Sequence, residues 1–231
     1  MNDLQRFQHH SSLEVHSRQA RAIIAGHYPE RSTTTTKKSY PIYGLIAYGL
    51  SLTVIWQRIR ADDPYAELTL IEVERRIRKA FELIQNRMRS IDQKLMETLP
   101  GIQVDLYQSR QPLIISLNDS AFATTHAKLG ARLVGLFDLL IRKLVTGKQF
   151  GIINLANFER SQYHATKVVR GVFAAPAEYR NRGVNRADIQ EKTEKGIAAT
   201  EADGPLPLDI MNRERHSEFG PKPTPHRDEP Q

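Results

Sequence analysis

The chain has 231 residues, of which 40% are hydrophobic and 26% charged, a composition typical of one globular domain with or without tails. It contains no cysteine, which excludes disulfides, thiolate nucleophiles and cysteine-bound metal sites and fits a reducing compartment such as the cytoplasm. The net charge is +7, and residues 128–195 hold 13 Lys and Arg against 6 Asp and Glu, so phosphate groups, and hence nucleic acid, are the first partners to consider.

The first forty residues are expected to form an N-terminal arm and a flexible linker. Residues 1–12 are polar and lack the apolar core of a secretory signal. Leu13 and Val15 alternate with polar residues ahead of a helix-like stretch at 18–25, and residues 32–39 include four successive threonines. That run is typical of a solvated loop.

A stretch without charge follows, between Ser39 and Gln57. A membrane span needs about 20 mostly apolar residues, and here Ser51 and Thr53 interrupt the run. We therefore predict a buried helix over residues 41–60 in place of a membrane span. This helix is expected to begin a single core domain, residues 41–200.

Asp62, Asp63 and Pro64 mark the start of a long helix that runs to about residue 99. Its apolar positions step alternately by four and three residues, which is a heptad seam. The favoured interpretation is that the seam packs on Ile46, Leu50 and Val54 of the preceding helix, and the alternative is a coiled coil between two chains. The seam residues are Ile77, Phe81, Ile84, Met88, Ile91 and Leu95.

The next segment predicts a β hairpin near residues 102–117. Ile102, Val104 and Leu106 alternate with polar residues, the period of a half-buried strand, and residues 113–117 are an apolar second strand. Asn118, Asp119 and Ser120 can then cap a helix that continues to residue 147, with a break near Gly130 left open. The expected fold class is mainly α with a short β hairpin, α+β.

Strand, helix, helix is the order of a ribbon-helix-helix module, in which two chains pair their strands and place the ribbon in the major groove of DNA. An ordinary core hairpin is the alternative. In the second strand only Ser116 could hydrogen-bond a base, while in the first strand Gln103 suits adenine and Asp105 would repel phosphate.

A further helix is predicted over residues 155–174, ending before Pro176. Arg160, Lys167 and Arg170 gather on its surface near His164, which indicates either a DNA-contacting face or a solubilising one. Including the neighbouring segments, the candidate DNA-binding residues are Gln103, Arg110, Ser116, Lys128, Arg132, Arg160, Lys167, Arg170, Arg180, Arg182 and Arg186.

Motifs of catalysis are not found in the sequence. Gly147-Lys148 lacks both the earlier glycine of a phosphate loop and a following Ser or Thr. No two histidines are spaced as on a zinc-binding helix, and Glu72 and Glu74 are explained by a solvated helix face. We therefore expect no enzyme, no metal or other cofactor and no small-molecule ligand.

The C-terminal part is expected to contain a short helix over residues 188–200 and a Pro-rich, largely disordered tail over residues 201–231. Prolines recur through the tail, and the segment after Phe219 has almost no apolar surface to offset the entropy of ordering. Whether Leu206, Leu208 and Ile210 dock on the core is left open, docking being the commoner outcome.

Five segments together resemble a family of integrating-conjugative-element proteins that includes the plasmid conjugation activator AcaB. They are residues 13–21 (LEVHSRQAR), 183–189 (GVNRADI), 194–199 (EKGIAA), 204–210 (GPLPLDI) and 216–221 (HSEFGP). The resemblance implies a bacterial mobile-element context and transcriptional activation by DNA binding, and it supplies no catalytic residues. The apolar second strand departs from a clear ribbon-helix-helix reader.

The function expected from these observations is that of a homodimeric regulator of conjugative transfer genes that binds double-stranded promoter DNA in the bacterial cytoplasm. Phosphates would be held by the basic segment and bases read between residues 103 and 132. The alternative is a non-DNA interaction subunit of the conjugation or element-maintenance machinery, which would dock partners through the heptad helix and the Pro-rich tail.

Overall fold

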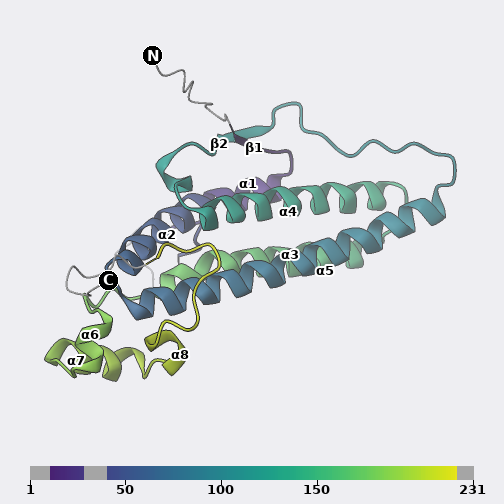
Figure 1. Cartoon of the computed structure of the whole chain (residues 1–231). Helices are drawn as coiled ribbons and strands as arrows, with labels where there is room; N and C mark the ends of the chain where they lie inside the picture. Colours follow the sequence, from purple (N-terminus) through teal and green to yellow (C-terminus); the bar gives the residue numbers. More distant parts are fainter. Residues whose placement is uncertain (1–10, 29–40, 223–231) are drawn as a thin grey trace, which may run out of the picture.

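The structure is a computed structural model that describes residues 11–28 and 41–222. It confirms a mainly helical α+β fold with one two-stranded sheet (Figure 1). No helix in these described ranges is both long and apolar enough to cross a membrane. In chain order the elements are β1 (Ser12–Val15), α1 (Arg18–Ala25), α2 (Leu45–Arg60), α3 (Pro64–Thr98), β2 (Leu113–Ser116), α4 (Thr125–Gln149), α5 (Leu155–Ala174), α6 (Arg186–Gln190), α7 (Glu194–Asp203) and α8 (Leu208–Met211).

The core of the molecule lies among α3, α4 and α5, with α1 and α2 packed against them. The heptad seam of α3 faces this core. Ile77, Ile84 and Ile91 are at most 3% exposed, and the intervening seam positions are partly buried against the same cluster. The seam is therefore covered by the chain's own helices, since α3 packs chiefly against α4 and also against α2 and α5.

The prediction that the seam packs on Ile46, Leu50 and Val54 is wrong, because these three side chains are 40–48% exposed. Helix α2 buries its other face instead. Apolar residues lie on both faces of this helix, so the periodicity of the sequence did not show which face is buried. The buried face is the one that carries Gly49. A Cβ at Gly49 would lie 2.0 Å from the Ala121 carbonyl oxygen, which leaves room only for glycine.

Helix starts follow the expected capping chemistry in part. Asp63 caps α3 by accepting hydrogen bonds from the amides of Tyr65 and Ala66, as predicted. Helix α4 begins later than expected, with Thr124 as its cap, and it is unbroken at Gly130. That glycine lies against the Tyr48 ring, 2.5 Å from where a Cβ would be, so it serves contact between α2 and α4.

The predicted hairpin over residues 102–117 is wrong in its pairing. Strand β2 pairs antiparallel with β1, with Ser12 opposite Ser116 and Val15 opposite Leu113. Residues 102–108 form no strand, although Val104 and Leu106 are half-buried. Period-two alternation reports an extended chain with one face covered, and it does not identify a hydrogen-bonding partner.

The sheet also changes the ribbon-helix-helix interpretation. The order strand, helix, helix is present as β2, α4 and α5, but β2 pairs with a strand of the same chain. The outward face of this ribbon carries Ser12, Glu14, Ile114 and Ser116. One carboxylate and one large apolar side chain among four positions make a poor surface for reading bases.

Both ends of the described chain belong to the packed structure. Ala20, Ile23 and Ile24 of α1 are buried, so the core begins within the segment expected to be an arm. The predicted helix over 188–200 is two helices, α6 and α7, separated near Lys192, whose φ of 54° is left-handed. Residues 201–222, expected to be largely disordered, pack on the domain, and Ile210 is fully buried. Residues 1–10, 29–40 and 223–231 lie outside the described residues.

Candidate nucleic-acid interface

Helix α4 presents positive charge with no exposed carboxylate. Its cations are Lys128, Arg132, Arg142, Lys143 and Lys148, and its one acid, Asp138, is 2% exposed. Asp138 accepts hydrogen bonds from the backbone amides of His16 and Ser17, at 3.1 and 2.7 Å. The carboxylate thus holds the start of α1 against α4 and contributes little to the field outside the protein.

Helix α5 adds a second exposed basic surface. Arg160, Lys167 and Arg170 are all exposed, and Glu159 is the only acid of the helix. Asn154 caps α5, its side chain accepting from the amide of Asn157 at 2.9 Å. Together α4 and α5 carry eight Lys and Arg against two carboxylates, which accounts for most of the +7 of the chain.

Several of these cations have no carboxylate partner among the described residues. The exposed ones are Lys128, Arg132, Lys148, Arg160, Lys167 and Arg170. Arg132 extends toward α3, where its guanidinium lies 5.1 Å from the centre of the Phe81 ring. Lys143, in contrast, bonds Asp92 of α3, and Arg142 donates to the Tyr107 carbonyl oxygen at 2.5 Å. The unpaired cations therefore lie on two helices that pack side by side.

The loop after α5 divides the remaining predicted arginines. Arg180 is exposed and donates to the Ala177 carbonyl oxygen at 2.5 Å. Arg182 is exposed but forms two hydrogen bonds with the Asp203 carboxylate, at 2.8 and 2.9 Å. This pairing lowers the pKa of Asp203 and raises that of Arg182. Arg180 is thus the less neutralised of the two.

The prediction that Arg186 belongs to the DNA-contacting surface is wrong, because this side chain is 4% exposed. Its guanidinium bonds the carboxylates of Asp62 and Glu67 and donates to the Ile210 carbonyl oxygen at 3.1 and 3.2 Å. Arg186 therefore ties α6 to the start of α3 and to α8. A buried arginine enclosed by carboxylates has no access to phosphate.

The last described segment extends this buried network. His216 Nδ1 lies 2.7 Å from Glu67 Oε1, and Arg213 donates to Asp62 Oδ2 at 3.0 Å. Both carboxylates therefore have a second cationic or hydrogen-bonding partner. Sequence reasoning treated Asp62 as part of a helix start and did not consider Glu67, because the spacing of acids along a helix does not show which of them is buried.

Glu74 forms a second buried network and is not on a solvated face as predicted. Its carboxylate accepts from Ser217 Oγ at 2.5 Å, from the amides of Glu218 and Phe219, and from His126 Nε2 at 2.7 Å. Trp56 Nε1 donates to His126 Nδ1. Because Nδ1 accepts this hydrogen bond, the ring hydrogen that faces Glu74 is on Nε2. Burial alone would raise the pKa of Glu74, but these hydrogen bonds outweigh it and lower the pKa to about 2.

The predicted base-contacting residues occupy the connection between α3 and α4. Gln103 and Arg110 are exposed in the stretch between α3 and β2. Ser116 is exposed on the outward face of β2, where its hydroxyl accepts from the Asn118 amide at 3.2 Å. Ser109 holds the same connection to the domain, since its amide donates to His16 Nδ1 at 3.3 Å.

Across residues 11–28 and 41–222, no group of three or more His, Asp or Glu side chains is arranged to hold an ion. His126 and His216 each bond a single buried carboxylate. These side chains are explained by the packing of the C-terminal segment against α3.

The fold and this surface define a mainly helical protein with exposed positive charge on two packed helices. A family model described as "Transcriptional regulator AcaB" matches residues 4–223, so the chain belongs to the AcaB family of transcriptional regulators.

A solved structure shares the fold. It is a selenomethionine-containing AcaB from uropathogenic E. coli, 17% identical, with a TM-score of 0.54, and the match covers 90% of this chain and 97% of the AcaB chain. None of the curated proteins compared with the chain matches it.

Proposed function

We propose that this regulator binds double-stranded promoter DNA and activates conjugative transfer genes on a mobile genetic element, acting as a homodimer in the bacterial cytoplasm. The observation that carries the proposal is the surface of α4 and α5, where exposed cations of both helices have no carboxylate partner among the described residues and the one acid of α4 is buried. Such a surface gains affinity for phosphate through counterion release.

Phosphate contacts are assigned to the exposed cations of this surface, and specificity to the polar residues beside it. Lys128, Arg132, Arg160, Lys167 and Arg170, with Arg180 beside them, would hold the DNA backbone. Gln103, Arg110 and Ser116 are exposed in the connection ahead of α4 and would contact base edges. This division follows the general rule that phosphate contacts position a protein and base contacts select its site.

The proposed homodimer is supported by the exposed apolar stripe of α2. Ile46, Leu50 and Val54 lie four residues apart and so share one helix face, and each is at least 40% exposed. No charged side chain interrupts α2 before Arg58. A second copy would cover the stripe, and two-fold pairing matches the symmetry of regulators that bind paired half-sites.

The alternative function, a non-DNA interaction subunit, would use the heptad helix and the Pro-rich tail. Ile84 and Ile91 are at most 2% exposed within the domain, and Glu218 and Phe219 bond Glu74 through their amides. The heptad face and the described part of the tail are engaged by the chain itself, so the basic surface is the stronger basis for function.

The test of DNA binding is a salt titration with the element's own promoter fragment and a random fragment. The triple variant R160A, K167A and R170A removes exposed cations only. If all three contact phosphate, the slope of log affinity against log salt concentration falls in magnitude by about 2 to 3. The matched control is R75A, R78A and K79A, which removes three exposed cations of α3.

An unchanged slope in the α5 variant, or equal losses in the two variants, would contradict the assignment of phosphates to α5. A reporter driven by the same promoter then tests the sign of regulation. Activation predicts that wild-type protein raises expression and that the α5 variant, with its fold intact by circular dichroism, does not.

A further inference from the structure

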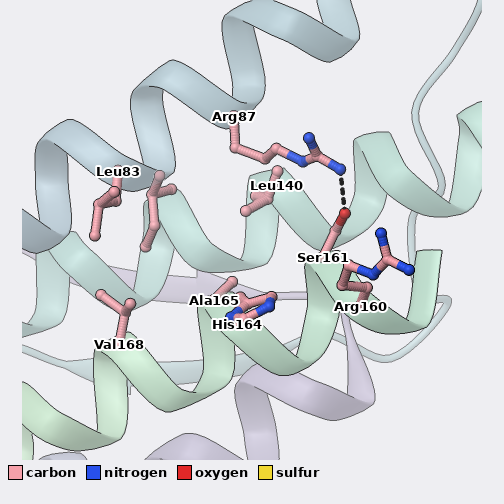
Figure 2. A pocket seen from close by; sticks show the side chains of 9 residues that line it. Leu83, Arg87, Leu140, Arg160, Ser161, His164, Ala165 and Val168 are labelled. Atoms are coloured by element: carbon pink, nitrogen blue, oxygen red, sulfur yellow. Dashed lines mark hydrogen bonds between the residues drawn. The ribbon is translucent and has the colours of Figure 1, made fainter. Parts of the chain in front are cut away.

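A cleft of about 360 Å³ lies between α3, α4 and α5, and of the proposed DNA contacts only Arg160 lines it (Figure 2). Its walls are aliphatic: Leu83 and Ile84 come from α3, Leu140 from α4, and Ala165 and Val168 from α5. Ile84 and Leu140 are each 1% exposed and form the floor, whereas Leu83 is 46% exposed at the mouth. The volume falls within the range of small-molecule sites, roughly 300 to 1,000 Å³.

The two ends of the cleft differ in polarity. Figure 2 shows Leu83 and Val168 toward one end and Arg87, Ser161 and Arg160 toward the other. The guanidinium of Arg87 donates to Ser161 Oγ, and that hydroxyl donates to the Asn157 carbonyl oxygen at 2.6 Å. This chain of hydrogen bonds holds Arg87 in place over the polar end.

The charge of the lining is entirely of one sign. Arg87 and Arg160 line the cleft, and no carboxylate of the described residues does. Arg160 has no carboxylate partner among the described residues. A ligand that suits the cleft therefore needs an anionic group at one end and an aliphatic body of modest length behind it.

We propose that this cleft binds a medium-chain fatty acid. Its carboxylate would accept hydrogen bonds from Arg87 and Arg160, since guanidinium groups match carboxylate geometry. Its chain would lie along Leu83, Ile84 and Val168. A nucleic-acid phosphate could reach Arg160 at the surface, but sugar and base would leave the aliphatic floor uncovered.

One consequence rests on the proposed DNA-binding function, because Arg160 belongs to both sites. A bound fatty acid would neutralise Arg160 and so reduce the positive charge that α5 presents to DNA. Ligand and DNA would then weaken each other's binding, by the same factor in both directions.

The test of the cleft itself needs no DNA. Calorimetric titration of the full chain with decanoate, below its micellar range, is expected to show saturable one-site binding, and the neutral analogue decanol is expected to bind at least about tenfold more weakly. R87Q is expected to weaken decanoate at least about tenfold. The matched control R89Q removes an exposed arginine of the same helix and should leave affinity unchanged.

A second variant guards against a loss caused by misfolding. L83Q alters a wall residue that is nearly half-exposed, so the fold is kept and decanoate should bind several-fold more weakly. Absence of saturable decanoate binding, equal binding of decanol, or full affinity in R87Q would overturn the proposal. A chain that binds decanoate but no DNA would contradict the proposed function and leave the cleft assignment standing.

Discussion

Two regions of the same basic segment use their arginines in opposite ways. On α5, Arg160 and Arg170 are exposed and have no carboxylate partner among the described residues. A short distance further along the chain, Arg186 is 4% exposed and enclosed by Asp62 and Glu67. The comparison shows that charge counted along a sequence is not charge presented at a surface, because burial and pairing cancel the field of the second group.

The largest effect is expected from breaking the buried side of this comparison. R186Q leaves the carboxylates of Asp62 and Glu67 in the interior without their main cation, and removing one partner of a buried pair costs about 3 to 5 kcal/mol. Urea unfolding followed by circular dichroism measures the change. The partial compensation by Arg213 and His216, which bond the same carboxylates, is included in that range.

The control for this variant is R182Q, which removes an arginine that is also paired with a carboxylate but is exposed. Exposed pairs contribute about 1 kcal/mol or less, so R182Q should unfold close to wild type. Equal destabilisation by the two variants would mean that burial of Arg186 is not what distinguishes it.

A second test uses pH on the Glu74 network. The pKa of Glu74 is lowered to about 2, below its ordinary value near 4.5, so its ionised form stabilises the fold fully above about pH 4.5. That contribution, roughly 3 kcal/mol from the size of the lowering, is lost as the pH falls toward 2. E74Q should remove most of this acid dependence and lower stability at neutral pH.

The matched control is E82Q on the same helix, where the side chain is exposed. Urea unfolding from pH 6 to pH 2.5 should give parallel curves for E82Q and wild type and a flatter curve for E74Q. A parallel curve for E74Q would show that other groups carry the acid sensitivity.

Local chemistry predicted much of the fold. Asp63 and Pro64 identified the start of α3 because capping depends on a few adjacent residues, and the seam of α3 identified its buried face because the opposite face is charged. The partner of β2 was not predictable in this way. Strand pairing across a long stretch of sequence depends on how helices bring β1 over α4, and no local period encodes that.

The candidate site was predictable to the extent that exposure follows from helix periodicity. Arg160, Lys167 and Arg170 fall on the exposed face of a helix whose apolar positions define the other face. Arg186 is the first residue of α6, a helix too short for the spacing of its apolar residues to show which face is buried. Its burial depends on pairing with Asp62 and Glu67, which are distant in sequence. The sequence does not show this pairing, and an arginine without a known partner is predicted to be exposed.

A third test concerns the exposed apolar face of α2, which is expected to be covered by a second copy of the chain. L50E places a carboxylate in the stripe and should weaken the proposed dimer by about a hundredfold, or 2 to 3 kcal/mol, without unfolding the chain. Sedimentation equilibrium measures this. The control I197E changes another exposed apolar residue, on α7, and wild-type assembly is expected; a monomeric wild-type chain would contradict the homodimer.

The smallest effect on affinity is expected from an exposed polar residue that contacts a base edge and does not stabilise the fold. Gln103 is exposed in the connection between α3 and β2, so Q103A should leave stability unchanged. If Gln103 contacts a base edge, the variant loses about 1 kcal/mol of preference for the promoter at one position, while binding to random DNA stays the same. K128A should do the reverse, weakening promoter and random DNA alike and lowering the salt slope by about 1. Affinities measured on promoter fragments with single base-pair changes separate the two patterns, and a uniform loss in Q103A would move base reading to Arg110 or Ser116.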